Sequence, residues 1–280
     1  KRGIRILGLI SNETLPGTPE QWRANSYETS GGSGANPYLD KLSDTFAYIA
    51  SSWRAVIKRY EIWNEPNAPA TSIYPSNLSD LLAKCYAKLR WSGVADVNLT
   101  SGGIFAHNLE GYTWNSSGAS YLDQLYDTGL NRTGQLAWVR GHFGADPIDE
   151  VGTNLYVSQG GGMQGKDVYG VASYFDNIQR AMRKHGLTAK IRVTETGWKV
   201  APGGPSQENQ ASNLVNVASL CRQRPDVAGL MYYKLMDGLG DATWGLLSAP
   251  SYAPRTSFYS WAQMNGVDVN TLANPTIDWS

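Results

Sequence analysis

The sequence has few features that would tie it to a membrane, a nucleic acid or a metal. Its apolar runs all fall short of the roughly 20 residues that a membrane-spanning helix needs. Its 24 Lys and Arg residues balance 24 Asp and Glu residues, so charge gives no reason to expect a nucleic acid or an anionic membrane as partner. The three histidines, His107, His142 and His185, lack the spacing of metal ligands. We therefore expect no bound metal.

Cysteine is scarce, and the common nucleotide and nucleophile motifs are missing. Cys85 and Cys221 are the only cysteines, and two cysteines in helix-like segments predict buried free thiols and no disulfide framework. The chain has no P-loop and no Gly-x-Ser-x-Gly nucleophile elbow. Residues 160–165 spell Gly-x-Gly-x-x-Gly, but no acidic residue ends a following strand to hold a ribose, which favours a loop near the active site. We expect no cofactor.

Short apolar runs alternate with helix-like segments along the 280 residues. This alternation predicts βα units around a parallel sheet. Barrels of this kind have about 250 residues in one domain, and no linker divides the chain, so we expect a single domain over residues 1–280. The predicted strands are residues 4–10, 59–64, 98–104, 150–156, 190–195 and 229–234. The predicted helices are residues 37–52, 77–91, 171–185, 207–222 and 256–265.

Two of the predicted strands end in a glutamate. Residues 60–67 read YEIWNEPN, so one strand ends at Asn64 and Glu65 before a proline, and residues 192–198 read RVTETGW, so another ends at Glu195 before a glycine. The carboxyl ends of barrel strands line the active-site face, so both side chains can point into one cleft. A single glutamate there is commonly solvated or salt-bridged. A pair can protonate a glycosidic oxygen and attack the sugar, which indicates a glycosidase.

These motifs resemble those of clan A glycoside hydrolases, the cellulase-like superfamily that includes families five, thirty-nine and fifty-one. Asn64-Glu65-Pro66 is similar to the tripeptide that closes barrel strand four and carries the acid/base, and Glu195-Thr196-Gly197 is similar to the stretch that closes strand seven with the nucleophile. The resemblance implies an α/β fold, the (β/α)8 TIM barrel. It also implies a retaining hydrolase that cleaves a β-linked oligo- or polysaccharide through a covalent glycosyl-enzyme intermediate.

The resemblance implies further substrate-binding residues beside the glutamates. Asn64 would hydrogen-bond the sugar 2-hydroxyl, although a strand-end cap is the alternative. Tyr156 would hydrogen-bond Glu195 or else belong to the core, and Asn154 stands where relatives often have histidine.

Aromatic residues supply the remaining candidates. Trp198 is expected to form a subsite wall, and Tyr233 and Trp244 are the candidates for stacking on the sugar. Tyr121 belongs to the aromatics expected on loops. For His107, a plain surface position is favoured over a place in the cleft.

The six predicted strands fall short of eight. If Glu65 closes strand four, residues 4–10 must form strand three, and the first two strands have no place before them. Residues 274–280, NPTIDWS, resemble the stretch that precedes strand three in relatives. We therefore hypothesise that the chain is a fragment, or a rearranged form, of a longer barrel that is incomplete at its first two strands. An open sheet has two exposed edges, so we expect self-association to cover them.

Two alternatives to a hydrolase remain open. One is a non-catalytic carbohydrate-binding barrel protein, because fold alone does not fix function, and the other is a transglycosylase that uses the same glutamates. Asn-x-Ser/Thr sequons and a first residue other than Met fit a secreted or extracellular protein. The sequons begin at Asn12, Asn77, Asn98, Asn115 and Asn131. Cellulose, mannan, xylan and galactan all remain possible substrates.

Overall fold

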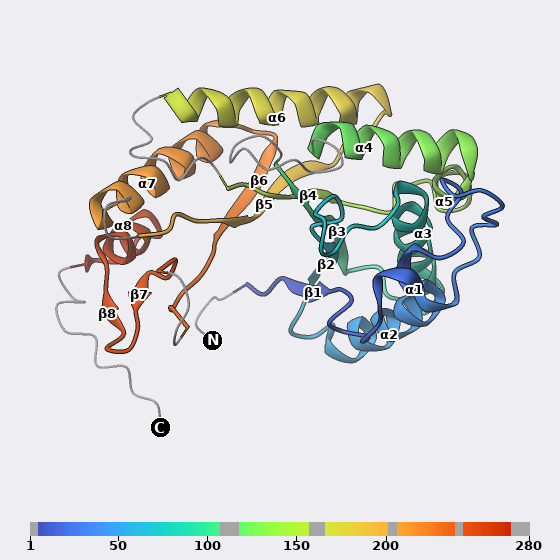
Figure 1. The fold of residues 1–280 in the computed structure, drawn as a ribbon, viewed down its shortest axis with the longest axis horizontal. Coiled ribbons are helices and arrows are strands. Elements are labelled where there is room, and N and C mark those ends of the chain that lie inside the picture. Colours follow the sequence, from blue (N-terminus) through green and yellow to red (C-terminus); the bar gives the residue numbers. More distant parts are fainter. Residues whose placement is uncertain (1–4, 107–117, 157–165, 201–205, 239–242, 270–280) are drawn as a thin grey trace.

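A computed structural model describes residues 5–106, 118–156, 166–200, 206–238 and 243–269. Its central feature is a six-stranded parallel sheet in the order β1-β2-β3-β4-β5-β6 (Figure 1). The strands are β1 Gly8–Ile10, β2 Arg59–Asn64, β3 Asn98–Phe105, β4 Glu150–Asn154, β5 Lys190–Thr196 and β6 Val227–Tyr232. All six predicted strands are present, which confirms the α/β fold, and β1 is the one that is much shorter than predicted.

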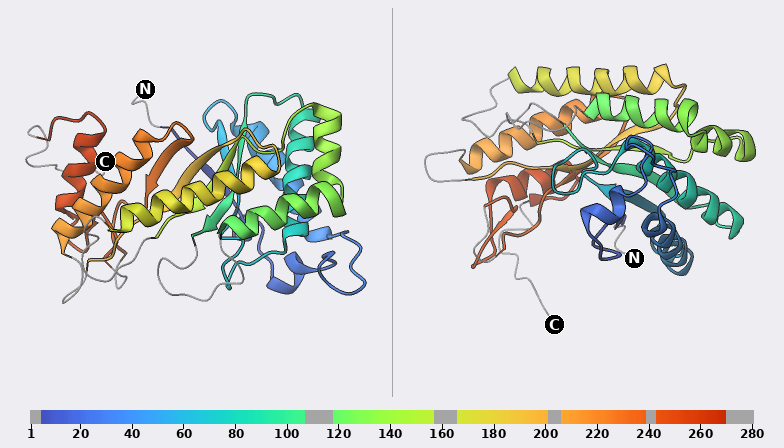
Figure 2. Two further views of the ribbon diagram at one scale, coloured as in Figure 1. Left: turned by 90° about the horizontal axis from the view of Figure 1, so that it is seen from above. Right: turned by 45° about the vertical axis from the view of Figure 1, so that its right-hand side comes forward.

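Helices form an outer layer that curves around this sheet (Figure 2). They are α1 Pro19–Arg23, α2 Pro37–Trp53, α3 Pro75–Trp91, α4 Gly118–Asp127, the π-helix η1 Thr128–Arg132, α5 Gln135–Phe143, α6 Lys166–Lys184, α7 Gln207–Gln223 and α8 Thr256–Met264. A short hairpin, β7 Leu247–Ser248 with β8 Ala253–Pro254, precedes α8. Five helices match the prediction, whereas α1, α4, η1 and α5 were not predicted. Tyr121 was wrongly expected on a loop, because it lies buried in α4.

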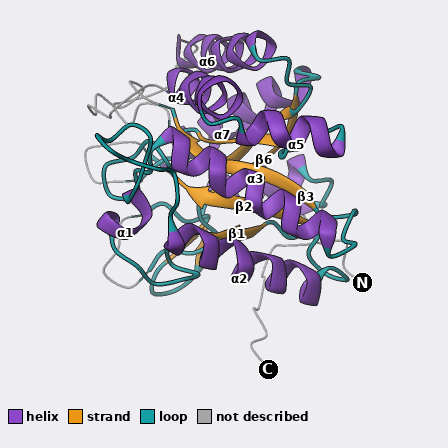
Figure 3. Ribbon diagram, turned by 90° about the vertical axis from the view of Figure 1, so that its right-hand side faces the viewer, coloured by secondary structure: helices purple, strands orange, loops and turns teal. Residues whose placement is uncertain are grey.

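The sequence explains how α2 begins and which face it buries. In α2, Pro37 occupies the first turn, and the side chain of Asn36 accepts hydrogen bonds from the backbone N–H groups of Tyr38 and Leu39. Leu39, Leu42 and Phe46 follow at helical spacing, and all three are fully buried. The apolar stripe of α2 therefore packs inward, beside α3 and the first strands (Figure 3).

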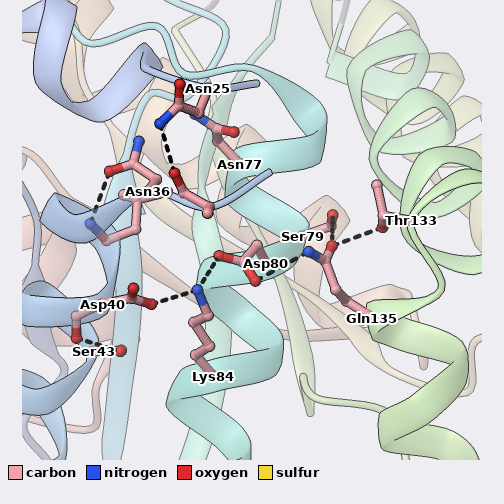
Figure 4. A network of polar contacts seen from close by, with 12 residues as sticks. Asn25, Asn36, Asp40, Ser43, Asn77, Ser79, Asp80, Lys84, Thr133 and Gln135 are labelled. Atoms are coloured by element: carbon pink, nitrogen blue, oxygen red, sulfur yellow. Dashed lines mark hydrogen bonds and ion pairs between the residues drawn. The ribbon is translucent and has the colours of Figure 1, made fainter. Parts of the chain in front are cut away.

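A polar network joins the helices that cover the first half of the sheet (Figure 4). The ammonium group of Lys84 on α3 pairs with Asp40 on α2 and, at 2.6 Å, with Asp80 on its own helix. Asp80 also accepts a hydrogen bond of 3.0 Å from the side-chain amide of Gln135 on α5. Lys84 thus links α3 to α2, and the buried carboxylate of Asp80 links α3 to α5, which fixes the spacing of these helices.

The sheet does not close into a barrel within the described residues. A cavity of about 780 Å³ separates its two edges and is lined by Ile6 and Leu7 before β1 and by Met231 and Tyr232 of β6. This open arrangement agrees with a barrel that is incomplete at its first two strands. Residues 274–280, on which the rearrangement hypothesis also rested, lie outside the described residues, as do residues 160–165 and His107.

The two cysteines and the lengths of the helices bear on two smaller predictions. Cys85 and Cys221 are both buried free thiols, as expected. Within the described part of the chain, no helix has the length and apolarity that crossing a membrane requires.

Candidate active site

The two motif glutamates both lie where the carboxyl ends of the parallel strands meet, although their strands are not neighbours. Strands β3 and β4 lie between β2 and β5, and the strand ends are aligned in register, with Asn64 beside Gly103, Phe105 beside Asn154, and Asn154 beside Glu195. The side-chain amide of Asn154 donates to Glu65 Oε1 at 3.1 Å and to Asn64 Oδ1 at 3.4 Å. Asn154 therefore bridges the end of β2 and the end of β5.

An unusual backbone aims Glu65 at this position. Trp63 and Glu65 have positive φ angles of 77° and 45°, a region that residues other than glycine rarely adopt. The loop after β2 holds this conformation, because Thr71 donates its hydroxyl to the Glu65 carbonyl at 2.9 Å and accepts the indole N–H of Trp63 at its own carbonyl. Strained backbone of this kind persists where the surrounding structure fixes it, and such places are often functional sites.

Tyr156 holds the second glutamate. Its phenolic hydroxyl donates to Glu195 Oε2 at 2.6 Å, and this is the contact that the family resemblance implied. The ring of Tyr156, two residues after β4, is stacked on Phe105 of β3, with a centroid separation of 5.9 Å, so β3 also sets its position. A short hydrogen bond from a neutral phenol stabilises an ionised carboxylate.

Burial raises the proton affinity of both glutamates, and the charge of Glu65 adds to the rise at Glu195. Burial raises the pKa of Glu65, and the hydrogen bond from Asn154 opposes that rise. Burial also raises the pKa of Glu195, to about 7, with the charge of Glu65 adding to the rise and the Tyr156 bond opposing it. The rise is the larger at Glu195, the nucleophile candidate, and the Tyr156 hydrogen bond is the contact that favours its ionised form.

Two further aromatic rings lie against Tyr156, the residue that contacts Glu195. The ring of Tyr156 lies 6.2 Å from that of Tyr233 and 5.4 Å from that of Trp244, and the latter two lie 6.3 Å apart, all in edge contact. Tyr233 is 38% exposed. Both predicted stacking residues thus lie beside Tyr156, which in turn contacts the nucleophile candidate.

Two predicted substrate contacts lie differently from what was expected. Trp198 is fully buried and its ring packs near that of Tyr232, so the prediction of a subsite wall there is wrong. Asn154 is also fully buried. It contacts Glu65 and has no surface for a sugar, whereas the half-buried Asn64 keeps an accessible side chain.

The sequence prediction missed three residues beneath the pair, namely Glu61, Gly103 and Thr194. The side chain of Glu61 accepts the backbone N–H of Gly103 at 2.6 Å, and Thr194 donates its hydroxyl to Asn154 Oδ1 at 2.8 Å. A signal existed for Glu61, because it is a charged residue between the apolar Tyr60 and Ile62 inside a predicted strand. Among the described residues, no group of three His, Cys, Asp or Glu side chains is arranged to hold a metal.

No protein-family model matches this sequence, and no curated protein matches it by sequence. Solved structures do match its fold. An endo-β-1,3-glucanase of family GH128 from Amycolatopsis mediterranei aligns at 16% identity and a TM-score of 0.53, covering 78% of each chain. A monomeric β-xylosidase from Caulobacter crescentus aligns at 15% identity and a TM-score of 0.57, covering 88% of this chain and 50% of the xylosidase. A family 39 glycoside hydrolase from Bacteroides cellulosilyticus gives 20% identity, a TM-score of 0.52, and coverage of 81% and 44%.

At these identities the likeness concerns the fold alone. The chain spans about three quarters of the glucanase and about half or less of the other two. The sequence resemblance and the structural likeness agree, because both point to barrel-type glycoside hydrolases. The chain shares the TIM-barrel type of fold of these solved structures, with a six-stranded sheet that is open in the described residues.

Proposed function

We propose that this chain is a retaining β-glycoside hydrolase of the clan A type, with Glu65 as acid/base and Glu195 as nucleophile. One observation supports this most strongly. Two half-buried carboxyl groups, one directly after β2 and one at the end of β5, are linked through Asn154, which donates to Glu65 and lies beside Glu195 in register. The charge of Glu65 raises the pKa of Glu195 and so favours a state in which only one of the two is ionised, as glycoside hydrolysis needs.

In the first step, a carboxylate oxygen of Glu195 forms a bond to the anomeric carbon while the bond from that carbon to the leaving oxygen breaks. Glu65 gives its proton to the leaving oxygen. In the second step, Glu65 takes a proton from water, the water oxygen bonds to the anomeric carbon, and Glu195 leaves as a carboxylate. The Tyr156 hydroxyl stabilises the ionised Glu195 before the first step and after the second.

The neighbouring side chains fit a sugar in front of this pair. Asn64 is half-buried and lies beside Glu65 at the end of β2, so its amide can donate to a sugar 2-hydroxyl, a bond that strengthens in the transition state. Tyr233 and Trp244 supply ring surface for the apolar face of the sugar. Asn154 and Tyr156 position the two carboxyl groups.

The substrate that we propose is a β-linked glucan or xylan. The structural neighbours include an endo-β-1,3-glucanase crystallised with laminaritriose and laminaribiose, and a β-xylosidase. Such glycans occur outside cells, so we also propose a secreted protein that acts as one catalytic domain. Of its sequons, Asn77 is buried in the first turn of α3 and is therefore a poor glycosylation site.

Intact-mass analysis after incubation with activated 2-deoxy-2-fluoro glycosides of glucose, xylose, mannose and galactose tests the proposal. We expect one adduct per wild-type chain with the glucoside or the xyloside and none with Glu195→Gln. The sugar that labels the protein names the substrate class. The open sheet favours one other function, that of a non-catalytic carbohydrate-binding protein. Measurable glycan binding without any adduct would support that function and overturn ours.

A further inference from the structure

A third carboxyl group lies beneath the two proposed catalytic glutamates. Glu61 belongs to β2, four residues before Glu65, and is only 5% exposed. Its Oε1 atom accepts the backbone N–H of Gly103 at 2.6 Å. Gly103 is the register partner of Asn64 on the neighbouring strand β3. The carboxyl group of Glu61 therefore fastens β3 to β2 directly below the candidate site.

Gly103 has no side chain, and several polar side chains meet in the space that is left free. A Cβ atom on this residue would lie 2.7 Å from Glu61 Oε1, 2.3 Å from Asn154 Oδ1 and 2.7 Å from Thr194 Oγ1, so no larger residue fits. Side chains from β2, β4 and β5 thus converge on one glycine of β3. The convergence fixes the orientation of Asn154, because Thr194 donates to its amide oxygen and the amide nitrogen is left facing Glu65.

The charges that act on Glu61 have the same sign as its own. Glu195 and Glu65 both disfavour its ionisation, and burial, which is the largest influence, raises the pKa of Glu61 to about 8 despite the hydrogen bond from Gly103. A buried carboxylate without a paired cation is costly. A third negative charge below the pair would also disturb the balance between a protonated and an ionised glutamate above it.

We propose that Glu61 is a positioning residue that acts as a neutral carboxyl group. It anchors Gly103 so that Asn154 holds Glu65 in place, and it keeps a third charge away from the Glu65–Glu195 pair. This role rests on the function proposed above.

Two substitutions separate these contributions. Glu61→Gln keeps an oxygen acceptor for the Gly103 N–H group and is neutral at every pH, so we expect kcat/KM and the acidic limb of its pH profile to match the wild type below the pH at which Glu61 itself ionises. Glu61→Ala removes the anchor. We expect its kcat to fall about 10- to 100-fold with little change in KM, the scale of a small misplacement of a catalytic group. Restored activity in Glu61→Gln shows that the acceptor, and not the charge, is what matters.

Two outcomes would overturn this role. An active Glu61→Gln variant with both pH limbs moved to lower pH would mean that Glu61 is ionised in the working enzyme, because loss of that charge lowers the pKa values of Glu65 and Glu195. A Glu61→Ala variant as active as the wild type would remove the anchoring role. If Glu61→Ala fails to fold, the pH profile of Glu61→Gln decides.

Thermal unfolding tests the neutral state without relying on activity. A group whose folded pKa is about 8 binds a proton that the unfolded chain has already lost, so it reduces stability progressively from about pH 4.5 to about pH 8. We therefore expect the Tm of Glu61→Gln minus that of the wild type to increase between pH 5 and pH 8. A constant difference would contradict a protonated Glu61. If the wild type is never labelled by a fluoroglycoside yet this increase appears, the proposed function fails while the neutral carboxyl group stands.

Glu150→Gln is the matched control. Glu150 is another buried carboxyl group on the sheet, but Arg192 contacts it at 2.5 Å and Arg59 at 3.0 Å. Burial alone would raise the pKa of Glu150, and these two cations hold it below its usual value. Its folded and unfolded states are both ionised above pH 5. The Tm difference between Glu150→Gln and the wild type should therefore stay constant over the range in which that of Glu61→Gln increases.

Discussion

The four central strands of the sheet and its two edge strands are built very differently. Every residue of β4 is buried, and in β3 only the first residue is not. No residue of β6 is fully buried, and at the other edge Ile6 and Leu9 are 44% and 42% exposed. Of the two glutamates of the candidate site, Glu65 directly follows β2 and Glu195 is on β5, and both strands have a hydrogen-bonded neighbour on each side.

The central strands hold groups whose positions must be accurate, whereas the edge strands carry the risk of association with other chains. A catalytic group must stay within a fraction of an ångström of its productive position, and strands paired on both sides provide that rigidity. The edges expose apolar side chains and unpaired backbone groups, which favours association with other chains. If the comparison holds, changes in the central strands should act on catalysis and stability, and changes at the edges should act on association.

The largest effect is expected for Glu195→Ala. The nucleophile is lost, so kcat should fall by at least about 10⁴-fold, as happens when other enzymes lose their nucleophile. Stability at neutral pH should not decrease, because a buried carboxyl group with a raised pKa is removed. Steady-state kinetics with an aryl glycoside and a thermal unfolding curve measure both quantities. Activity within tenfold of the wild type would rule Glu195 out as nucleophile.

Glu65→Ala should have the next largest effect. Loss of a general acid lowers the rate about 10²- to 10⁴-fold for substrates with a poor leaving group. An activated leaving group needs no protonation, so the loss should be smaller there, and azide should restore turnover of the glycosyl-enzyme by replacing the base-activated water. Product analysis by NMR would show a glycosyl azide of retained configuration. An equal loss for both leaving groups would argue against an acid role.

A matched pair of isoleucines compares the two regions in stability. Ile62 in β2 is fully buried, and Ile6 at the edge is 44% exposed. Ile62→Ala should lower the free energy of unfolding by about 2–5 kcal/mol because it leaves a cavity in a closely packed core. Ile6→Ala should change that free energy by about 0.5 kcal/mol or less, as is usual at exposed positions. Urea denaturation measures both, and similar losses would mean that the edge is packed as tightly as the centre.

The sequence could predict where the central strands end, but not which side chains from different strands contact one another. Strand ends were predictable because apolar runs stop at Asn64-Glu65 and at Glu195, and the register of parallel strands brings such ends together. The orientation of the Asn154 side chain could not be predicted, because it depends on Gly103 and Thr194 from two neighbouring strands. Local sequence shows that a residue ends a strand but not which neighbours surround it.

Trp198 and α4 show two further reasons why the sequence prediction differed from the structure. Trp198 follows a strand end like an exposed subsite residue, yet α7 covers it and Gln210 donates to its carbonyl at 2.7 Å. Only tertiary packing could show that. In α4, buried Tyr121, Leu122, Leu125 and Tyr126 follow helical spacing, so this helix was detectable from the sequence and was overlooked. The five-residue α1 is too short to produce a periodic signal.

Tyr156→Phe should produce a moderate effect within the central strands. The phenol stabilises ionised Glu195, so its removal should raise the pKa of Glu195 above about 7 and move the acidic limb of kcat/KM to higher pH. A shift of one pH unit corresponds to about 1.4 kcal/mol and costs about tenfold in rate below the limb. Tyr60→Phe is the control, because the Tyr60 hydroxyl is buried on β2 without a hydrogen-bond partner in the described structure. If the acidic limb of kcat/KM does not move in Tyr156→Phe, another group stabilises the ionised form of Glu195.

Ile6→Glu should have the smallest effect on activity and tests the edge directly. Arg5, Arg59 and Arg192 line the same cavity as Ile6, so a glutamate is preferable there to a lysine. A charge on an exposed edge discourages edge-to-edge pairing. We expect the wild type to self-associate at high concentration, and the variant to have a lower mass by light scattering coupled to size exclusion, with unchanged kcat/KM. A wild type that is monomeric throughout would make the self-association prediction wrong. A variant that loses activity like Tyr156→Phe would show that the edge contributes to the site, and the division between centre and edge would no longer hold.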